Sequence, residues 1–66
     1  MIIQLNGHSK ELVQNQSLKS LIEGFCKQHN RVIAEVNGEI IKSHSWETIT
    51  VKDGDTIELV SFVGGG

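Results

Sequence analysis

The sequence is poor in the residue types on which several classes of protein depend. It has 66 residues, no proline, a single cysteine and only three aromatic side chains. One cysteine cannot form an internal disulfide, which argues against a secreted disulfide scaffold. Together with three histidines it does not give the paired spacing of a zinc site. Three scattered aromatic residues are also too few for a base-stacking surface.

Charge and hydropathy exclude two further classes. Six basic and eight acidic residues give a net charge of −2, and none of them gather into the basic stripe that nucleic-acid binding needs. No apolar run approaches the ~20 residues of a membrane span, and the first residues lack the basic segment of a signal peptide. We therefore expect one small domain in the cytoplasm, monomeric when free, with no nucleic-acid or membrane partner.

One segment has the pattern of an amphipathic helix. After Ser17, apolar residues recur at the i, i+3, i+4, i+7, i+8 positions that form one face of a helix: Leu18, Leu21, Ile22, Phe25 and Cys26. Ser17 is a favourable N-cap because its hydroxyl can accept a hydrogen bond from an amide of the first turn. The sequence predicts a single helix here.

The rest of the chain reads as short strands joined by tight turns. Asn6-Gly7 and Asn37-Gly38 are the strongest two-residue hairpin signals, because both central positions of a type I′ turn require positive φ. Alternating or β-rich runs predict strands over residues 2–6, 8–14, 31–36, 39–41, 48–51 and 56–63. This order predicts an α+β fold of the ubiquitin-like β-grasp type, a mixed sheet of about five strands with one main helix packed on one face.

The chain ends in three glycines, Gly64-Gly65-Gly66, directly after the last predicted strand. Glycine has no Cβ and loses the most conformational entropy when it is ordered, so such an end is expected to be flexible. We assign residues 1–63 to the β-grasp domain and residues 64–66 to a flexible, thin C-terminal tail.

A β-grasp domain that ends in a glycine pair resembles the ubiquitin-like sulfur carriers, and most closely the ThiS family of thiamine thiazole biosynthesis. The resemblance covers the whole chain. It rests on the small size, the Asn6-Gly7 turn, the turn at residues 51–55, the strand that follows and the terminal Gly65-Gly66. Trp46 also lies where such carriers often place an aromatic residue. Gly64 is a small departure, since many relatives end in two glycines.

The resemblance implies a chemistry centred on the chain end. A ThiF-like adenylating enzyme would activate the Gly66 carboxylate with ATP and Mg²⁺, and a persulfide enzyme would supply sulfur. The product would be a C-terminal thiocarboxylate that donates sulfur to a ThiG-like thiazole synthase. ATP and Mg²⁺ would be bound by the partner, so this chain would be a protein substrate with no bound cofactor or metal, and not an enzyme. Side chains at Gly65 or Gly66 would widen the end that must enter a narrow cleft.

The strand before the glycines suggests where partners bind. Ile57 and Leu59 are expected to face the helix, which turns Val60 and Phe62 to the opposite face. We predict a partner-docking surface at Val60, Phe62, Val63 and Gly64, with an ordinary solvent-facing sheet as the alternative. Ile2 and Ile33 are expected on the same face.

Several other interpretations stay open from the sequence. The small subunit of molybdopterin synthase has the same fold and ending, as does a carrier for another sulfur pathway. A ubiquitin-type modifier or a plain β-grasp interaction domain with an inert tail would belong to different functional classes. Among single residues, we expect Cys26 to act as a small hydrophobe and Trp46 to anchor a loop. We expect His8 and His44 to be solvated, and Asp53 and Asp55 to accept from local backbone amides.

Overall fold

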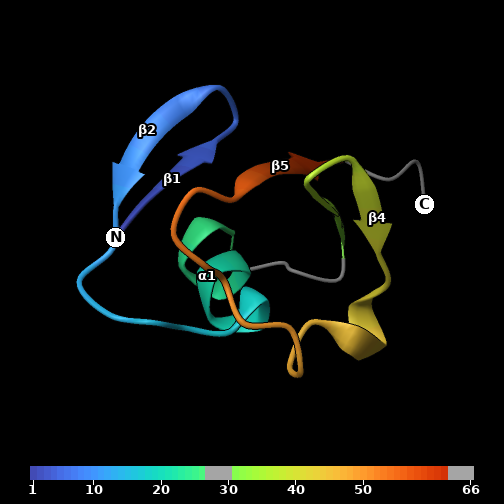
Figure 1. The fold of residues 1–66 in the computed structure, drawn as a ribbon. Helices are drawn as coiled ribbons and strands as arrows, with labels where there is room; N and C mark the ends of the chain where they lie inside the picture. The colour runs from blue at the N-terminus through green and yellow to red at the C-terminus, as the bar shows by residue number, and fades with distance from the viewer. Residues whose placement is uncertain (27–30, 63–66) are drawn as a thin grey trace.

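The computed structural model describes residues 1–26 and 31–62. In these residues the chain forms β1 (Ile2–Leu5), β2 (His8–Glu11), α1 (Leu18–Phe25), β3 (Val32–Val36), β4 (Glu39–Ile41), the short 3₁₀ helix η2 (Ser43–Ser45) and β5 (Thr56–Ser61). The sheet order is β2-β1-β5-β3-β4. The pair β1–β5 is parallel and the other three are antiparallel (Figure 1). The predicted mixed sheet with one main helix is therefore confirmed.

The helix begins where the sequence predicts. Ser17 has extended backbone angles and its hydroxyl accepts a hydrogen bond from the Ser20 amide at 3.0 Å. Leu18, Leu21 and Ile22 are buried, whereas Phe25, at the C-terminal end of the predicted apolar stripe, is 41% exposed. The helix ends at Phe25 because the next residue, Cys26, is already extended. The buried part of the apolar face of α1 is thus shorter than the sequence pattern predicts, because it does not include Phe25.

Both Asn-Gly turns form the tight hairpins that the sequence predicts. Asn6 and Asn37 each have φ of 52°, and the glycines that follow have φ of 82° and 87°. These are the left-handed angles that a type I′ turn requires and that asparagine and glycine tolerate best. The first turn joins β1 to β2, and the second joins β3 to β4.

The two turn asparagines also bind the last strand through their side chains. Asn6 Oδ1 accepts a hydrogen bond from the Leu59 amide at 2.7 Å, and Asn37 Oδ1 accepts one from the Thr56 amide at 2.9 Å. The parallel pairing of β1 with β5 covers only Gln4–Thr56 and Leu5–Ile57. Asn6 therefore adds one more hydrogen bond beyond the point where β1 turns away from β5.

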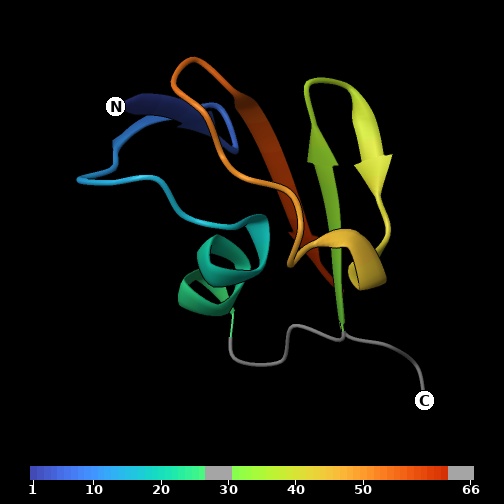
Figure 2. The same ribbon diagram turned by 60° about the horizontal axis from the view of Figure 1, so that its bottom comes forward.

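The core lies between α1 and one face of the sheet (Figure 2). The three inner strands of the sheet, β1, β5 and β3, each direct alternate side chains into this core, as expected for a sheet with one buried face. Trp46 is 4% exposed and its indole N–H donates to the Ile41 carbonyl at 2.9 Å, which confirms its predicted anchoring role. The buried residues of the core are Ile3, Leu12, Leu18, Leu21, Ile22, Val32, Ala34, Trp46, Val51, Ile57 and Leu59.

The predicted strand over residues 48–51 is wrong. Only Thr50 takes part in a sheet-like contact there, as a single isolated bridge to Ser17. The Val51 amide donates to Gln16 and the Leu18 amide to Ile49, so this segment pairs with the chain that leads into α1 and lies outside the main sheet. Four predicted strands are also shorter than expected. The first ends at Leu5, β2 ends at Glu11, β3 begins at Val32, and β5 ends at Ser61.

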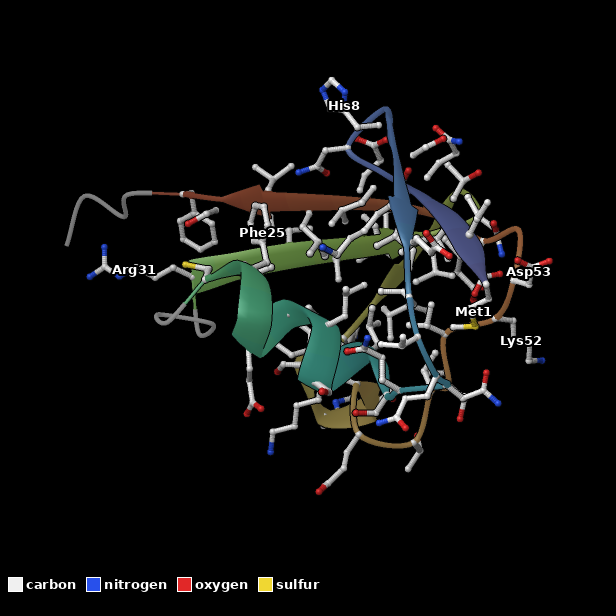
Figure 3. All side chains as sticks on the ribbon, turned by 90° about the vertical axis from the view of Figure 1, so that its left-hand side faces the viewer. Met1, His8, Phe25, Arg31, Lys52 and Asp53 are labelled. Carbon is white, nitrogen blue, oxygen red and sulfur yellow. The ribbon has the colours of Figure 1, made fainter. Side chains whose placement is uncertain are left out.

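The loop before β5 ties the start of the chain to the sheet. The Ile2 amide donates to Asp53 Oδ1 at 2.7 Å, and the Met1 ammonium donates to the Leu12 carbonyl at 2.9 Å. Figure 3 shows Met1 and Asp53 at the same end of the molecule. Asp55 accepts from the Lys52 amide, so one of the two aspartates binds a local amide as predicted and the other binds a remote one. Within the described residues, no helix is long and apolar enough to cross a membrane.

Candidate functional site

The face of the sheet opposite α1 is the candidate site. In residues 1–26 and 31–62, no helix packs on this outer face (Figure 2). Strand alternation directs Val60 and Ile33 to it, because their neighbours Leu59, Val32 and Ala34 are buried. Ile2, at 54% exposed, also lies there beside the buried Ile3. The predicted orientation of these residues is confirmed.

Three apolar side chains on this face form a cluster beside the end of β5. Ile33 and Val60 are direct cross-strand partners and are 48% and 56% exposed. Phe62 continues the ladder one position past β5, since its amide donates to the Arg31 carbonyl at 2.9 Å. Ser61 lies on the helix side, 3.6 Å from the sulfur of Cys26. Phe62 is 44% exposed, and we expect continued alternation to direct its side chain to the outer face. We call Ile33, Val60 and Phe62 the apolar patch.

One exposed residue of this face was missed by the sequence analysis. Ile40 of β4 is 64% exposed and faces outward opposite Glu35. It borders a shallow hollow of about 460 Å³ that is also lined by Ile33 and Trp46. The alternation of residues 39–41 contained the signal, but so short a run does not show which face is covered. Ile40 extends the exposed apolar surface from the patch toward the edge of the sheet.

Two acidic side chains lie next to the apolar patch. Glu35 of β3 and Glu58 of β5 are direct cross-strand partners, each two residues along its strand from a patch residue. Like charges directly opposite each other destabilise a sheet. The outer face therefore combines an apolar end with a carboxylate pair whose mutual repulsion weakens the folded state.

Replacing Glu58 with glutamine should raise the free energy of unfolding by about 0.2–1 kcal/mol, because it removes this repulsion and keeps the side-chain shape. Urea denaturation monitored by circular dichroism would measure the change, and the gain should shrink at high salt. Glu39→Gln is the matched control, since Glu39 lies opposite Val36. An equal gain in the control, or a loss in the Glu58 variant, would contradict the prediction.

The other residues singled out from the sequence have structural surroundings. Cys26 is half-buried, packs against the core and caps α1. His8 and His44 are exposed, as predicted. Phe25 stands between the end of α1 and β5, on the helix side of the sheet (Figure 3). The remaining predicted site residues, Val63, Gly64, Gly65 and Gly66, lie outside the described residues.

The chain matches a known protein family over nearly its whole length. The model of the ThiS family matches residues 3–66, which is nearly the whole chain and includes the three terminal glycines. The chain is also similar to sulfur carrier protein ThiS of Bacillus subtilis, with 33% identity over 66 residues that cover 98% of this chain and 100% of that protein.

A second kind of relative is much longer. The chain is 30% identical over its whole length to a thiazole synthase of Paramagnetospirillum magneticum, but spans only 20% of that protein. A thiazole synthase of Magnetococcus marinus gives a similar match, with 29% identity and the same 20% coverage. The chain therefore corresponds to one part of these proteins, about a fifth of their length.

The fold agrees with that of a solved relative. The crystal structure of the thiamine biosynthesis protein ThiS from Geobacter metallireducens matches with a TM-score of 0.85 and 30% identity, and the match covers 100% of both chains. The solution structure of the Geobacter protein gives a TM-score of 0.83 and covers 88% of that chain. By its sequence, and by the five-stranded sheet with α1 on one face that the described residues form, this chain belongs to the ThiS family.

Proposed function

We propose that this protein is a sulfur carrier in thiamine biosynthesis, and that Gly66 carries the sulfur as a C-terminal thiocarboxylate. The observation that carries the proposal is the family match, which runs through the last residue of the chain and so includes the glycines on which the chemistry depends. The similarity to the Bacillus carrier over the full length of both proteins supports it. In this role the chain is a cytoplasmic protein substrate and has no catalytic activity of its own.

The proposed reaction begins at the Gly66 carboxylate, which is ionised at neutral pH as an α-carboxyl group is. A carboxylate is a poor acyl donor, so a ThiF-like enzyme activates it. One carboxylate oxygen attacks the α-phosphate of ATP, pyrophosphate leaves, and an acyl-adenylate forms. The terminal sulfur of a persulfide then attacks the acyl carbon and AMP leaves, which gives an acyl disulfide with the donor. A thiol then attacks the donor's sulfur, the S–S bond breaks, a disulfide forms at the donor, and the thiocarboxylate is released. ATP and Mg²⁺ belong to the activating enzyme.

The chain's own contribution is to dock and to extend its end into the partner. The apolar patch lies on the uncovered face of β5, and β5 leads directly toward the glycines. A partner that covers Ile33, Val60 and Phe62 would therefore receive the chain end in a defined direction. Residues without side chains at positions 64–66 let the backbone enter a cleft narrow enough to keep water from the hydrolysable adenylate.

The proposed acceptor of the sulfur is a ThiG-like thiazole synthase. Two thiazole synthases contain a region similar to this whole chain, which is the expected arrangement if carrier and synthase work on each other. This supports the thiazole pathway over the alternative of a molybdopterin synthase subunit. Thiazole auxotrophy on loss of the gene would agree with the proposal, whereas loss of molybdoenzyme activity alone would contradict it.

Intact-mass analysis tests the chemistry directly. Protein incubated with the activating enzyme, ATP, Mg²⁺, a persulfide donor and a thiol reductant should gain the mass difference between sulfur and oxygen. Removal of Gly66 should abolish the heavier species and leave the denaturation curve unchanged, because the buried core is built from residues between Ile3 and Leu59. If the mass of this protein stays unchanged while the same enzyme modifies the carrier protein with which it naturally works, the proposal is wrong.

A further inference from the structure

The two Asn-Gly turns of this protein are chemically identical but differ in their surroundings. Both asparagines have φ of 52°, and both side-chain oxygens accept a backbone N–H of β5 or its start. The hydrogen bond of Asn6 is partly buried, whereas those of Asn37 are exposed. Asn37 also differs in a second contact, since its Nδ2 donates to Asp55 Oδ1 at 3.0 Å.

Asn-Gly sequences are open to a spontaneous reaction because glycine has no side chain to hinder it. The backbone nitrogen of the glycine attacks Cγ of the asparagine, and a new N–Cγ bond closes a succinimide. The Cγ–Nδ2 bond breaks, and ammonia leaves with the proton of the attacking N–H. Water then opens the succinimide at either carbonyl and gives aspartate or isoaspartate. The reaction needs water and no oxidant or reductant.

The side chain must leave its hydrogen bonds before Cγ can reach the glycine nitrogen. For Asn6 this leaves the partly buried Leu59 amide without an acceptor, and an unsatisfied buried donor is costly. For Asn37 the two hydrogen bonds, to the Thr56 amide and to the Asp55 carboxylate, are both exposed, so water replaces the lost contacts. The Asn37 turn therefore opens more easily than the Asn6 turn.

The products also differ. An aspartate at position 6 still offers the Leu59 amide an acceptor. An aspartate at position 37 brings a carboxylate against Asp55, where the amide group now donates. Asp55 in turn accepts from the Lys52 amide at 2.8 Å, so the repulsion falls on the loop that leads into β5.

We propose that Asn37 is a spontaneous deamidation site of this protein, and that the new carboxylate loosens the turn at the start of β5 by repelling Asp55. Asn6 also precedes a glycine, but it is protected by the partly buried hydrogen bond that it accepts from the Leu59 amide of β5. The site is a modification site independent of sulfur transfer, and it does not rest on the function proposed above.

The first test measures where the reaction occurs. The folded protein is incubated at mildly alkaline pH and both turn peptides are followed by mass spectrometry with isoaspartate detection. Asn37 should convert about tenfold faster than Asn6, the factor expected from one partly buried hydrogen bond that must be broken. In urea the two rates should become equal. Equal rates in the folded protein, or faster conversion of Asn6, would show that Asn37 is not the preferred deamidation site.

The second test measures the consequence with a double-mutant cycle. Asn37→Asp should lower the folding equilibrium constant about fivefold relative to Asn6→Asp, as expected for two unit charges ~4 Å apart in water. In an Asp55→Asn background, which keeps an acceptor for the Lys52 amide, the extra loss should disappear. A loss of the same size in both backgrounds would show that Asp55 is not involved and would overturn the mechanism.

Discussion

An Ile57→Ala variant should lose a large share of the free energy of unfolding of this domain. Ile57 is fully buried and lies in the central strand, with Leu5 on one side and Val36 on the other. Removing a buried isoleucine side chain to Cβ costs about 2–5 kcal/mol. The total stability of a chain of this length is only about 3–10 kcal/mol. One substitution therefore removes a large share of the stability of the whole domain.

Urea denaturation followed by circular dichroism would measure this loss. Val60→Ala is the matched control, because Val60 lies three residues further along the same strand and is 56% exposed. Its expected cost is within about 0.5 kcal/mol, as for most surface substitutions. Similar losses in the two variants would show that the core does not lie on the side of β5 that we describe.

Phe62→Asp should reduce the activation of the carrier by about 100-fold while the protein stays folded. Phe62 belongs to the apolar patch, and a carboxylate buried in an apolar interface without a partner costs several kcal/mol, of which about 2–3 should appear as lost affinity. The backbone hydrogen bond between Phe62 and Arg31 does not involve the side chain, so the sheet is not broken. ATP–pyrophosphate exchange with the activating enzyme measures the effect.

The control for this variant is Gln4→Asp. Gln4 lies on the same outer face but next to the polar residues Ser9 and Thr56, away from the apolar patch. The rate of ATP–pyrophosphate exchange with this variant should stay near the rate with the protein that carries no substitution. If Phe62→Asp were activated at the normal rate, the apolar patch would have no role in docking, and the solvent-facing alternative for this surface would be correct.

Local sequence patterns were sufficient for most elements of this fold. The alternation in β3 and β5 assigned Val60 and Ile33 to the outer face, and the N-cap at Ser17 marked the start of α1. These features depend on residues close in the chain. The same is true of the turns at Asn6 and Asn37, where the backbone angles depend on two neighbouring residues.

The residues whose roles could not be predicted are those whose contacts depend on distant parts of the chain. Residues 48–51 have strand-like composition, but they pair with the chain before α1 and not with the sheet. Phe25 continues the helical stripe, yet it lies beyond the reach of the small core. The bonds from Asn6 and Asn37 to β5 could not be predicted either, because they require the strand order. For the candidate site, the orientation of the apolar patch was predictable, whereas Ile40 and the opposed carboxylates were not.

The parallel pairing of β1 with β5 has a consequence for the order of folding. The first strand of the described chain lies against the last one, and β5 occupies the centre of the sheet. Contacts between residues so far apart in sequence form late and slow the folding of small domains. A nascent chain that stops before β5 has two separate hairpins and no central strand to join them. A partner that recognises the completed sheet therefore meets only molecules in which the strand leading to the glycines has already been made.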